Sequence, residues 1–377
     1  MRLLHTADWH LGRTFHGESL LDAHAAVIDH LVALARDAKV DAVVVAGDVY
    51  DRALPPVDAI RLASQALERL SEICPVIVIS GNHDSIDRLG FGARMFDRAG
   101  LHVRTRVADV GCAIPVADGV VYPVPYLEPD VVRAELGVQD RSHGAVLEAA
   151  MDRVRADLHH RSPQTPSAVV AHAFVTGAAV SDSERDLTVG GSASVAASVF
   201  DGVDYLALGH LHGPQSVGDL GRYAGSPVAL SFSEARHAKS TAIVEVLGLG
   251  STVELVPCPV PRALATLRGT LDELLRAPEL EIHEDAWVQA TITDAVQPPE
   301  TMARLRSRFP HAVSLQFDPQ GARPLEEGSY AERLEGLSDR ELVERFVQDV
   351  RGTVASEAES DLLDRAFAER RAAEVRA

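Results

Sequence analysis

The most informative segment of the chain is Val76-Ile-Val-Ile-Ser-Gly-Asn-His-Asp84. Its first half is an unbroken apolar run, which is typical of a buried strand, and its second half is a polar tetrapeptide at the point where that strand should end. Asn82 is the only asparagine in the chain, so a GNHD sequence is expected by chance about 2 times in 10,000 for this composition. The tetrapeptide is therefore a strong signal for a site at a strand end.

Similar junctions between an apolar run and a polar motif recur along the chain. The other motifs are Asp8-Trp-His10, Gly47-Asp48-Val-Tyr-Asp51, Gly209-His210-Leu-His212 and the single His172. A DxH triplet is expected about once by chance, GDxxD about 0.2 times and GHxH about 0.05 times. No single one of these motifs is decisive, so the inference rests on the whole set and on its position at successive strand ends.

The apolar runs alternate with stretches of helical periodicity. Strands are predicted at 2–6, 42–46, 76–80, 120–124, 168–173 and 205–208, and helices at 19–38, 57–72 and 144–159. This order predicts an α/β fold with a central sheet. In open α/β sheets ligands bind at the carboxyl ends of the strands, which is where the polar motifs fall.

The residue types of these motifs suit metal binding as a set. Aspartate, an asparagine carbonyl and neutral imidazole are ligands that hold Mn, Fe or Zn, without the thiolates of a structural zinc site. Two carboxylates, one amide and four imidazoles suffice for two metals, provided that one carboxylate bridges them. Such a metal pair is typical of phosphoester hydrolysis. The alternative is that these side chains only cap helices and satisfy loops.

Composition restricts the class of protein. The chain has 377 residues, 46% hydrophobic and 24% charged, as expected for a globular protein of about two or three domains. The net charge of −19 taken alone argues against a protein that wraps nucleic acid through charge. The three cysteines are far apart and are predicted to be reduced, buried thiols. No apolar run of about 18 residues and no signal sequence occurs, so we expect a cytoplasmic protein.

A proline-punctuated segment divides the chain. Pro257-Cys-Pro-Val-Pro-Arg262 predicts a boundary after a first domain at residues 1–260. Residues 261–322 are predicted to form a small domain of strand-helix-strand-helix-strand order. Residues 326–377 are predicted to form two helices, the first of which begins at a capping box, Ser338-Asp-Arg-Glu341. The pattern leaves open whether these helices cover this chain or bind a partner.

The order DxH, GDxxD, GNHD, single His and GHxH resembles the calcineurin-like metallophosphoesterase superfamily. Residues 1–12, residues 45–51 with Pro55 and Pro56, and residues 223–234 are similar to the bacterial SbcD nuclease subunits. The resemblance runs over essentially the whole chain. It implies a metallophosphoesterase β-sandwich flanked by helices, a small α/β capping domain that binds DNA, and C-terminal helices.

The same resemblance implies roles for individual residues. One metal is held by Asp8, His10 and His212, the other by Asn82, His172 and His210, and Asp48 bridges the two. His83 contacts the scissile phosphate or protonates the leaving 3′ oxygen. Asp84 orients His83 or caps the following helix, and orientation is the preferred role. The family implies Mn²⁺, whereas ligand chemistry alone does not separate Mn from Fe or Zn.

Three residues near the metal motifs are predicted to contact DNA. Arg13 and Arg52 directly follow motif residues and are expected to reach phosphates, although a solvated arginine fits the sequence equally well. His16 lies in the loop after the first motif and is expected to contact the substrate.

The resemblance also implies a function. It indicates a nuclease subunit that degrades duplex ends from 3′ to 5′ and cuts hairpins and single strands in DNA repair, recombination and replication. The chain has no GxxxxGK[ST] motif, so ATP dependence must come from a partner, the SMC-like ATPase SbcC. On this interpretation residues 326–377 dock the coiled coil of that partner, two copies of each protein form a heterotetramer, and the complex acts at the nucleoid.

Two alternatives remain open at this point. One is a phosphoesterase that acts on a small cyclic nucleotide or a phosphoprotein with the same metal site. The other is a binding scaffold with an inactive site, which the seven intact ligand residues and His83 disfavour.

Overall fold

The computed structural model describes residues 1–184, 194–319, 336–351 and 353–374. Two compact units divide the chain, Met1–Leu264 and Ala265–Ala377. The division falls four residues after the predicted boundary at residue 260. The second unit includes both the small domain and the C-terminal helices that the sequence predicts as separate parts.

The first unit contains a six-stranded sheet whose centre is parallel. Its order is β14 (Ser251–Pro257), β13 (Ser240–Val246), β1 (Arg2–Thr6), β4 (Ala42–Ala46), β5 (Val76–Ile79) and β6 (Leu101–Arg104). Four strands run parallel to one another: β1, β4, β5 and β6. Strands β13 and β14 are antiparallel to their neighbours. The carboxyl ends of β1, β4 and β5 therefore meet at one edge, and three of the polar motifs follow these ends.

A second six-stranded sheet belongs to the same unit. Its order is β11 (Gln215–Val217), β12 (Gly221–Tyr223), β10 (Tyr205–Gly209), β9 (Ser167–His172), β8 (Gly119–Val124) and β7 (Ile114–Val116). The inner strands β8, β9, β10 and β12 are parallel, and the edge strands β7 and β11 are antiparallel. The remaining two motifs, His172 and Gly209–His212, lie at the ends of β9 and β10.

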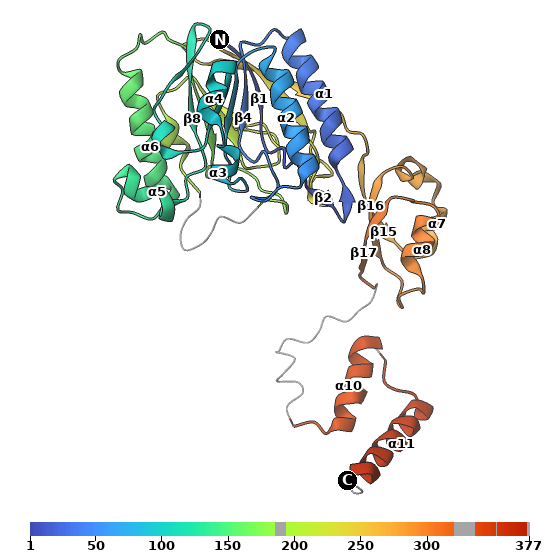
Figure 1. Cartoon of the computed structure of the whole chain (residues 1–377). Coiled ribbons are helices and arrows are strands. Elements are labelled where there is room, and N and C mark those ends of the chain that lie inside the picture. The colour runs from blue at the N-terminus through green and yellow to red at the C-terminus, as the bar shows by residue number, and fades with distance from the viewer. Residues whose placement is uncertain (185–193, 320–335, 352, 375–377) are drawn as a thin grey trace. The chain divides into compact units, whose positions relative to one another are not determined.

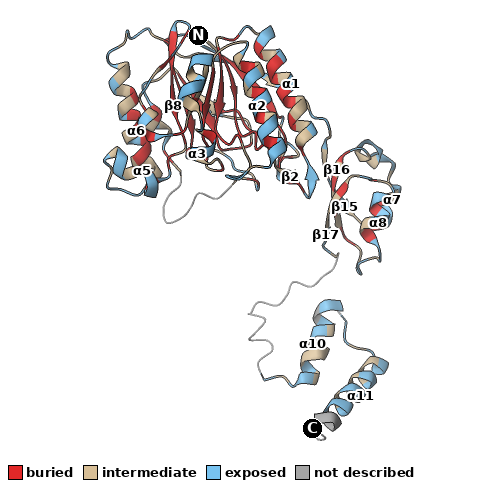
Figure 2. Ribbon diagram, in the orientation of Figure 1, coloured by how far each residue is buried: buried red, intermediate tan, exposed pale blue. Residues whose placement is uncertain are grey.

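The two sheets pack face to face. One buried cluster joins Val44 and Ile77 of the first sheet to Val170 and Tyr205 of the second. The inner strands are buried along their whole length because helices cover their other faces. This confirms the predicted α/β fold with a β-sandwich between helices (Figures 1 and 2).

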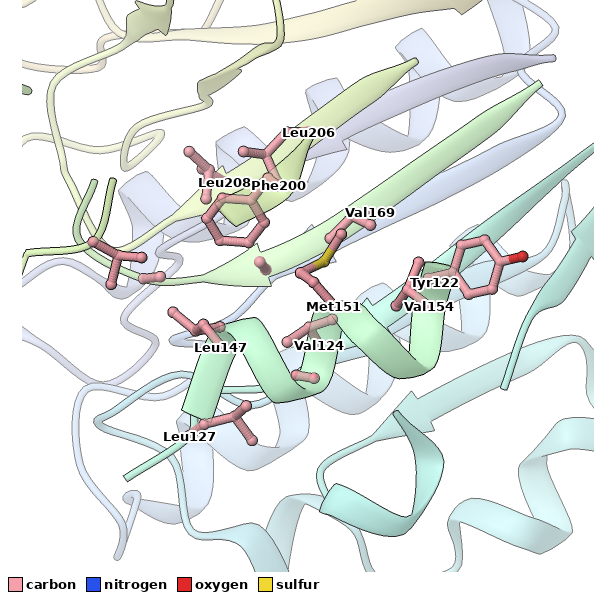
Figure 3. Close-up of a cluster of buried hydrophobic side chains, with 14 of the residues drawn as sticks. Tyr122, Val124, Leu127, Leu147, Met151, Val154, Val169, Phe200, Leu206 and Leu208 are labelled. Atoms are coloured by element: carbon pink, nitrogen blue, oxygen red, sulfur yellow. The ribbon is translucent and has the colours of Figure 1, made fainter. Parts of the chain in front are cut away.

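The covering helices use apolar faces at helical spacing. Helices α1 (Leu21–Asp37) and α2 (Val57–Ser71) lie side by side on the first sheet, and α5 (Pro129–Leu136) and α6 (His143–Leu158) on the second (Figure 1). Leu147, Met151 and Val154 of α6 belong to one buried cluster with Val169 and Leu206 of the second sheet, and Met151 lies beside Val169 (Figure 3). Short elements are β2 (Thr14–Phe15), β3 (Glu18–Ser19), α3 (Ile86–Leu89), α4 (Ala93–Phe96) and the 3₁₀ turns Asp97–Ala99, Val107–Asp109, Ala197–Phe200 and Phe232–Glu234.

The small domain has the predicted element order. It consists of β15 (Leu264–Gly269), α7 (Leu271–Arg276), the 3₁₀ turn Pro278–His283, β16 (Trp287–Ile292), α8 (Thr301–Arg306) and β17 (Ala312–Phe317). Val288 of the central strand packs with Leu274, Leu305 and Phe309 in a core of its own. The domain is thus a three-stranded sheet that packs against its helices through this core.

The C-terminal segment forms two helices, α10 (Asp339–Arg351) and α11 (Glu357–Glu374). The predicted capping box is present, since Ser338 N donates to Glu341 Oε2 at 2.8 Å and Glu341 N donates to Ser338 Oγ at 3.4 Å. Ion pairs join the two helices, from Arg340 to Asp364 at 2.7 Å and from Arg351 to Glu359 at 2.8 Å.

Two general expectations can be compared with the structure. All three cysteines are free, but only Cys258 is buried, and Cys112 is exposed, so the prediction of three buried thiols is wrong. Among the described residues, no helix combines the length and the apolar character needed to cross a bilayer.

Candidate metal centre

The polar motifs meet between the ends of the two sheets. Loops after β1, β4 and β5 supply Asp8, His10, Asp48 and Asn82, and strands β9 and β10 bring His172, His210 and His212 from the opposite sheet. Six of these seven side chains are buried, and Asn82 is half-buried. The structure thus brings together all seven residues for which the sequence predicts metal ligation.

The first group of potential ligands is Asp8, His10 and His212. One ligand atom from each lies within 4.8 Å of the others. The Nε2 atoms of His10 and His212 face each other at 3.0 Å. Two ring nitrogens that converge beside a carboxylate fit a site for a cation.

The second group centres on the only asparagine of the chain. Asn82 Oδ1 lies 2.9 Å from His172 Nε2 and 3.3 Å from His210 Nδ1. An amide oxygen and two imidazole nitrogens therefore point at one place, which is a donor set for a divalent transition metal.

Asp48 lies between the two groups. Its Oδ2 atom is 3.5 Å from His10 Nε2 of the first group and 3.6 Å from His172 Nε2 of the second. Its Oδ1 atom accepts a hydrogen bond from His83 N at 2.8 Å, which fixes the carboxylate plane. One carboxylate oxygen thus faces both groups, as a bridging ligand would.

The backbone at the site is held in unusual conformations. Asp8, His10, Asp48 and His210 all have positive φ, at 52°, 44°, 47° and 106°. Such conformations cost about 1–3 kcal/mol each in a residue other than glycine and persist only where the surroundings enforce them. Here hydrogen bonds between loops enforce them, from Asp8 N to Gly47 O and from His10 N to Asp48 O.

Two motif glycines leave room for the site. A Cβ atom on Gly47 would lie 2.4 Å from His172 Nδ1, and one on Gly81 would lie 2.1 Å from Asp48 Oδ1. Both distances are impossible for real atoms. The glycines of GDxxD and GNHD are therefore required so that the loops can approach the side chains of the site.

Burial controls the protonation of the site. Desolvation lowers the pKa of His10 to about 4 and that of His210 to about 3, so both imidazoles are neutral at pH 7 and able to bind a metal. Burial and the nearby charge of Asp48 raise the pKa of Asp8 well above its ordinary value. Divalent cations would supply the positive charge that this buried carboxylate lacks.

His83 is positioned by a backbone carbonyl. Its Nδ1 lies 2.7 Å from the carbonyl oxygen of Asp51, and because a carbonyl only accepts, Nδ1 carries a proton. The opposite nitrogen, Nε2, lies 4.0 Å from Asp48 Oδ2. His83 therefore faces the bridging position, and its ring nitrogen lies within 4.8 Å of ligand atoms of both His10 and Asp48.

Asp84, which is predicted to orient His83, binds backbone N–H groups of two loops. Its carboxylate accepts hydrogen bonds from Val49 N at 3.1 Å, Tyr50 N at 3.0 Å and Gly81 N at 3.0 Å. These bonds tie the loop after β4 to the loop after β5, while the Asp51 carbonyl orients His83. The next helix is capped by Ser85. Asp84 thus fixes the loops, because three nearby N–H groups compete successfully for its two oxygens.

Asp51 and the predicted DNA contacts lie beside this centre. Asp51 Oδ1 is 3.6 Å from His10 Nδ1 and pairs with Arg13 Nη1 at 3.0 Å. Arg13 is thus engaged with a carboxylate beside the centre. Arg52 approaches Asp51 only at 4.0 Å and its side chain is 56% exposed. His16 is exposed, and its ring lies 5.2 Å from that of Phe232.

Sequence reasoning missed a buried polar group behind His212. Glu234, Lys239 and Ser183 are buried and hydrogen-bonded around that residue. Glu234 ends the stretch 223–234 on which the family resemblance rests, and Lys239 is one of only two lysines. These were available signals, but neither specifies a contact with His212.

The clustered histidine and aspartate side chains fit a site for two metals, and comparisons with known proteins identify the class of enzyme. The family model of calcineurin-like phosphoesterases matches residues 1–214. The model of the type 5 capsule protein repressor C-terminal domain matches residues 260–351. The chain is 31% identical over 320 residues to the SbcD subunit of the nuclease SbcCD from Staphylococcus saprophyticus, covering 84% of each protein.

Solved structures of other proteins align with part of this chain. A protein of Thermus thermophilus aligns with 67% of this chain and 98% of its own length, with 13% identity and a TM-score of 0.39. A dimetal phosphatase from Danio rerio aligns with 67% of this chain and 98% of its own length, with 15% identity and a TM-score of 0.41.

The chain belongs to the calcineurin-like phosphoesterase family and, within it, to the SbcD family of nuclease subunits. It is thus a metal-dependent hydrolase of phosphoesters.

Proposed function

We propose that this chain is a DNA nuclease subunit that hydrolyses phosphodiesters at a centre of two divalent metals, with Mn²⁺ as the native ion. The observation that carries the proposal is the position of Asp48, whose Oδ2 lies 3.5 Å and 3.6 Å from a ring nitrogen of each histidine group. DNA as the substrate is supported by the similarity to a nuclease over 84% of both chains.

The proposal assigns the ligands by their grouping. Asp8, His10 and His212 hold one metal, Asn82, His172 and His210 hold the other, and Asp48 bridges them. When bound, two such metals lower the pKa of an attacking water and neutralise charge that develops on the phosphate oxygens.

His83 is the proposed general acid. The Asp51 carbonyl holds the proton on Nδ1, which leaves Nε2 directed at the centre. A proton on Nε2 can pass to the leaving 3′ oxygen, a step that typically contributes about 10²- to 10⁴-fold to the rate. Asp51 and Asp84 support this step indirectly, because they fix the loops that carry His83 and His10.

Arg52 and His16, which are exposed, are proposed to contact DNA, and the small domain at residues 261–322 is separately proposed to bind DNA. Arg13 is proposed to act mainly through its ion pair with Asp51. With these contacts the chain would degrade duplex ends from 3′ to 5′ and cut hairpins and single strands during DNA repair, recombination and replication at the nucleoid.

The proposed assembly contains an SMC-like ATPase, SbcC, and two copies of each protein. A relative named as a subunit of SbcCD supports this partner. Exposed apolar side chains on and beside α2 and α4 support pairing of two copies through the phosphoesterase domain: Leu54, Val57, Ile60, Phe91 and Met95. Exposed apolar residues on α10 support docking of the C-terminal helices on the coiled coil of the ATPase.

The test combines the purified chain with its ATPase partner, Mn²⁺, linear duplex DNA and, separately, bis(p-nitrophenyl) phosphate. We expect both substrates to be cleaved and light scattering to give two copies of each protein. His83→Gln should slow DNA cleavage by about 10²- to 10⁴-fold while the metal content stays unchanged. Asp48→Asn should lose both activity and bound metal, because both ligand groups share this carboxylate.

His160→Gln is the matched control, since this histidine is exposed near the end of α6. It should behave as wild type. Intact DNA in the presence of partner and Mn²⁺, together with consumption of a cyclic nucleotide, would sink the nuclease proposal and favour the small-substrate alternative.

A further inference from the structure

His212 is held from behind by a buried polar cluster that the proposed mechanism does not use. Its Nε2 faces His10 at the metal centre, and its Nδ1 faces away, 2.6 Å from Ser183 Oγ and 3.3 Å from Glu234 Oε1. Its backbone is held as well, because His212 N donates to Glu184 Oε1 at 2.7 Å. A ring held at Nδ1 has little freedom to turn its Nε2 out of the site.

Glu234 is the carboxylate of this cluster. It is 1% exposed and lies at the end of the 3₁₀ turn Phe232–Glu234. Oε1 faces His212 and accepts a hydrogen bond from Ser183, and Oε2 accepts from Lys239 Nζ at 2.5 Å and from Leu230 N at 3.2 Å. Both oxygens are therefore satisfied, which a buried carboxylate requires.

Lys239 completes the arrangement. It is 5% exposed and one of two lysines in a chain with 34 arginines. Its ammonium donates to Glu234 Oε2, to Ser226 Oγ at 2.8 Å and to the backbone oxygen of His212 at 2.9 Å. Three acceptors around one point suit the three donors of an ammonium, whereas the planar fork of arginine would not fit them. Lys239 thus holds His212 directly through its carbonyl and indirectly through Glu234.

Two of the other proposed ligand histidines have weaker or simpler support. His172 Nδ1 lies 3.0 Å from the backbone oxygen of Ala46. His10 Nδ1 lies 3.6 Å from Asp51, which pairs with the partly exposed Arg13. Among the contacts described for His10, His172 and His212, those of His212 include the buried carboxylate of Glu234. This carboxylate is itself paired with a buried cation, Lys239. Carboxylates behind ligand histidines fix the tautomer and raise ligand basicity, and their loss typically weakens metal binding about 10- to 100-fold.

We propose that Glu234 and Lys239 form a positioning pair for His212 and thereby set the affinity of one metal position, that of Asp8, His10 and His212, independently of the other. The inference rests on the proposed function, because it uses the proposed division of ligands. It predicts that damage to the pair produces a chain with one tight and one weak metal site.

The experiment titrates Mn²⁺ into the full metal-free chain and follows free Mn²⁺ by electron paramagnetic resonance. Wild type should bind two ions. Glu234→Gln and Lys239→Met should each keep one site at wild-type affinity and weaken the other about 10- to 100-fold. The matched control is Lys39→Met, which changes the other, exposed lysine and should bind as wild type. Excess Mn²⁺ should restore DNA cleavage by the weakened variants.

Folding is checked by circular dichroism, and Ser183→Ala replaces either variant that does not fold, since it removes the hydroxyl between Glu234 and His212. Unchanged affinity at both sites, or equal weakening of both, overturns the positioning role. A wild-type chain that binds no Mn²⁺ overturns the inference together with the proposed function. A chain that binds two ions with the predicted split but leaves DNA intact overturns only the nuclease proposal.

Discussion

Asp48 and Gly81 show how closely single residues are fitted at the site. Asp48 needs a left-handed backbone, at φ 47°, to direct its carboxylate between the histidine groups. Gly81 passes so close to that carboxylate that no side chain fits between them. The strain at Asp48 and the missing side chain at Gly81 are thus two parts of one arrangement, in which the loops after β4 and β5 are pressed together and tied by Asp84.

Gly81→Ala is therefore expected to damage the centre without unfolding the chain. The new Cβ would lie 2.1 Å from Asp48 Oδ1 and must displace the carboxylate from its place between the ligand groups. We expect Mn²⁺ affinity to fall by about 10-fold or more, measured by titration calorimetry, and DNA cleavage to fall with it.

Gly144→Ala is the control for this substitution. Gly144 lies in α6 with open space around the position of a Cβ atom, and alanine there should raise the free energy of unfolding by up to about 1 kcal/mol while metal binding stays unchanged. Wild-type metal affinity in Gly81→Ala would contradict the view that this glycine is required by Asp48.

At the scale of elements, burial decides what the sequence reveals. The strands Ala42–Ala46 and Val76–Ile79 are covered on both faces, so they are continuous apolar runs and are predictable nearly to the residue. The edge strands Ile114–Val116 and Gln215–Val217 are not predicted, because three residues with one open face carry no distinct pattern. Their pairing depends on a neighbouring strand and not on their own composition.

The site follows the same logic. The seven proposed ligand residues can be picked out from the sequence because they stand in compact motifs directly after buried strands. The support for these residues cannot be, because it comes from side chains far away in the sequence, such as Glu234 behind His212, or from backbone groups, such as the Asp51 carbonyl behind His83. No local pattern encodes contacts that form only when two sheets close on each other.

Helix α10 has an exposed apolar stripe. Phe346 and Val350 are 57% and 67% exposed and one helical turn apart, so they form an apolar stripe that suits a partner helix. Phe346→Glu should abolish copurification with the ATPase, and so should deletion of residues 326–377. Hydrolysis of bis(p-nitrophenyl) phosphate should continue, because the metal centre lies in the other unit.

Gln348→Glu introduces the same charge at an exposed position of the same helix and should leave copurification intact. If Phe346→Glu still copurifies at the wild-type level, the stripe is not the docking surface.

At the scale of the whole molecule, the charge of −19 must be reconciled with a DNA substrate. Residues 325–377 hold 14 acidic and eight basic side chains, so −6 of the total belongs to the proposed docking segment. Two divalent metals would add about +4 at the place where the phosphate must lie. Arg13 is paired with Asp51, which removes one cation from the count of free phosphate contacts. The rest of the chain is also acidic on balance. DNA phosphates are therefore expected to be attracted at the metal centre and not over a broad basic surface.

The isolated chain should therefore bind DNA weakly and with strong dependence on salt. We expect a dissociation constant of about 10⁻⁴ to 10⁻⁶ M at physiological salt, typical of contacts with phosphates alone. The partner should tighten binding by about 100-fold or more, because a second linked DNA-binding surface raises the effective concentration. Fluorescence anisotropy with the His83→Gln variant, in which cleavage is slow, measures both values at low and at physiological salt. Nanomolar affinity of the isolated chain for DNA would contradict this prediction, because it would show that the chain binds duplex DNA tightly without the partner.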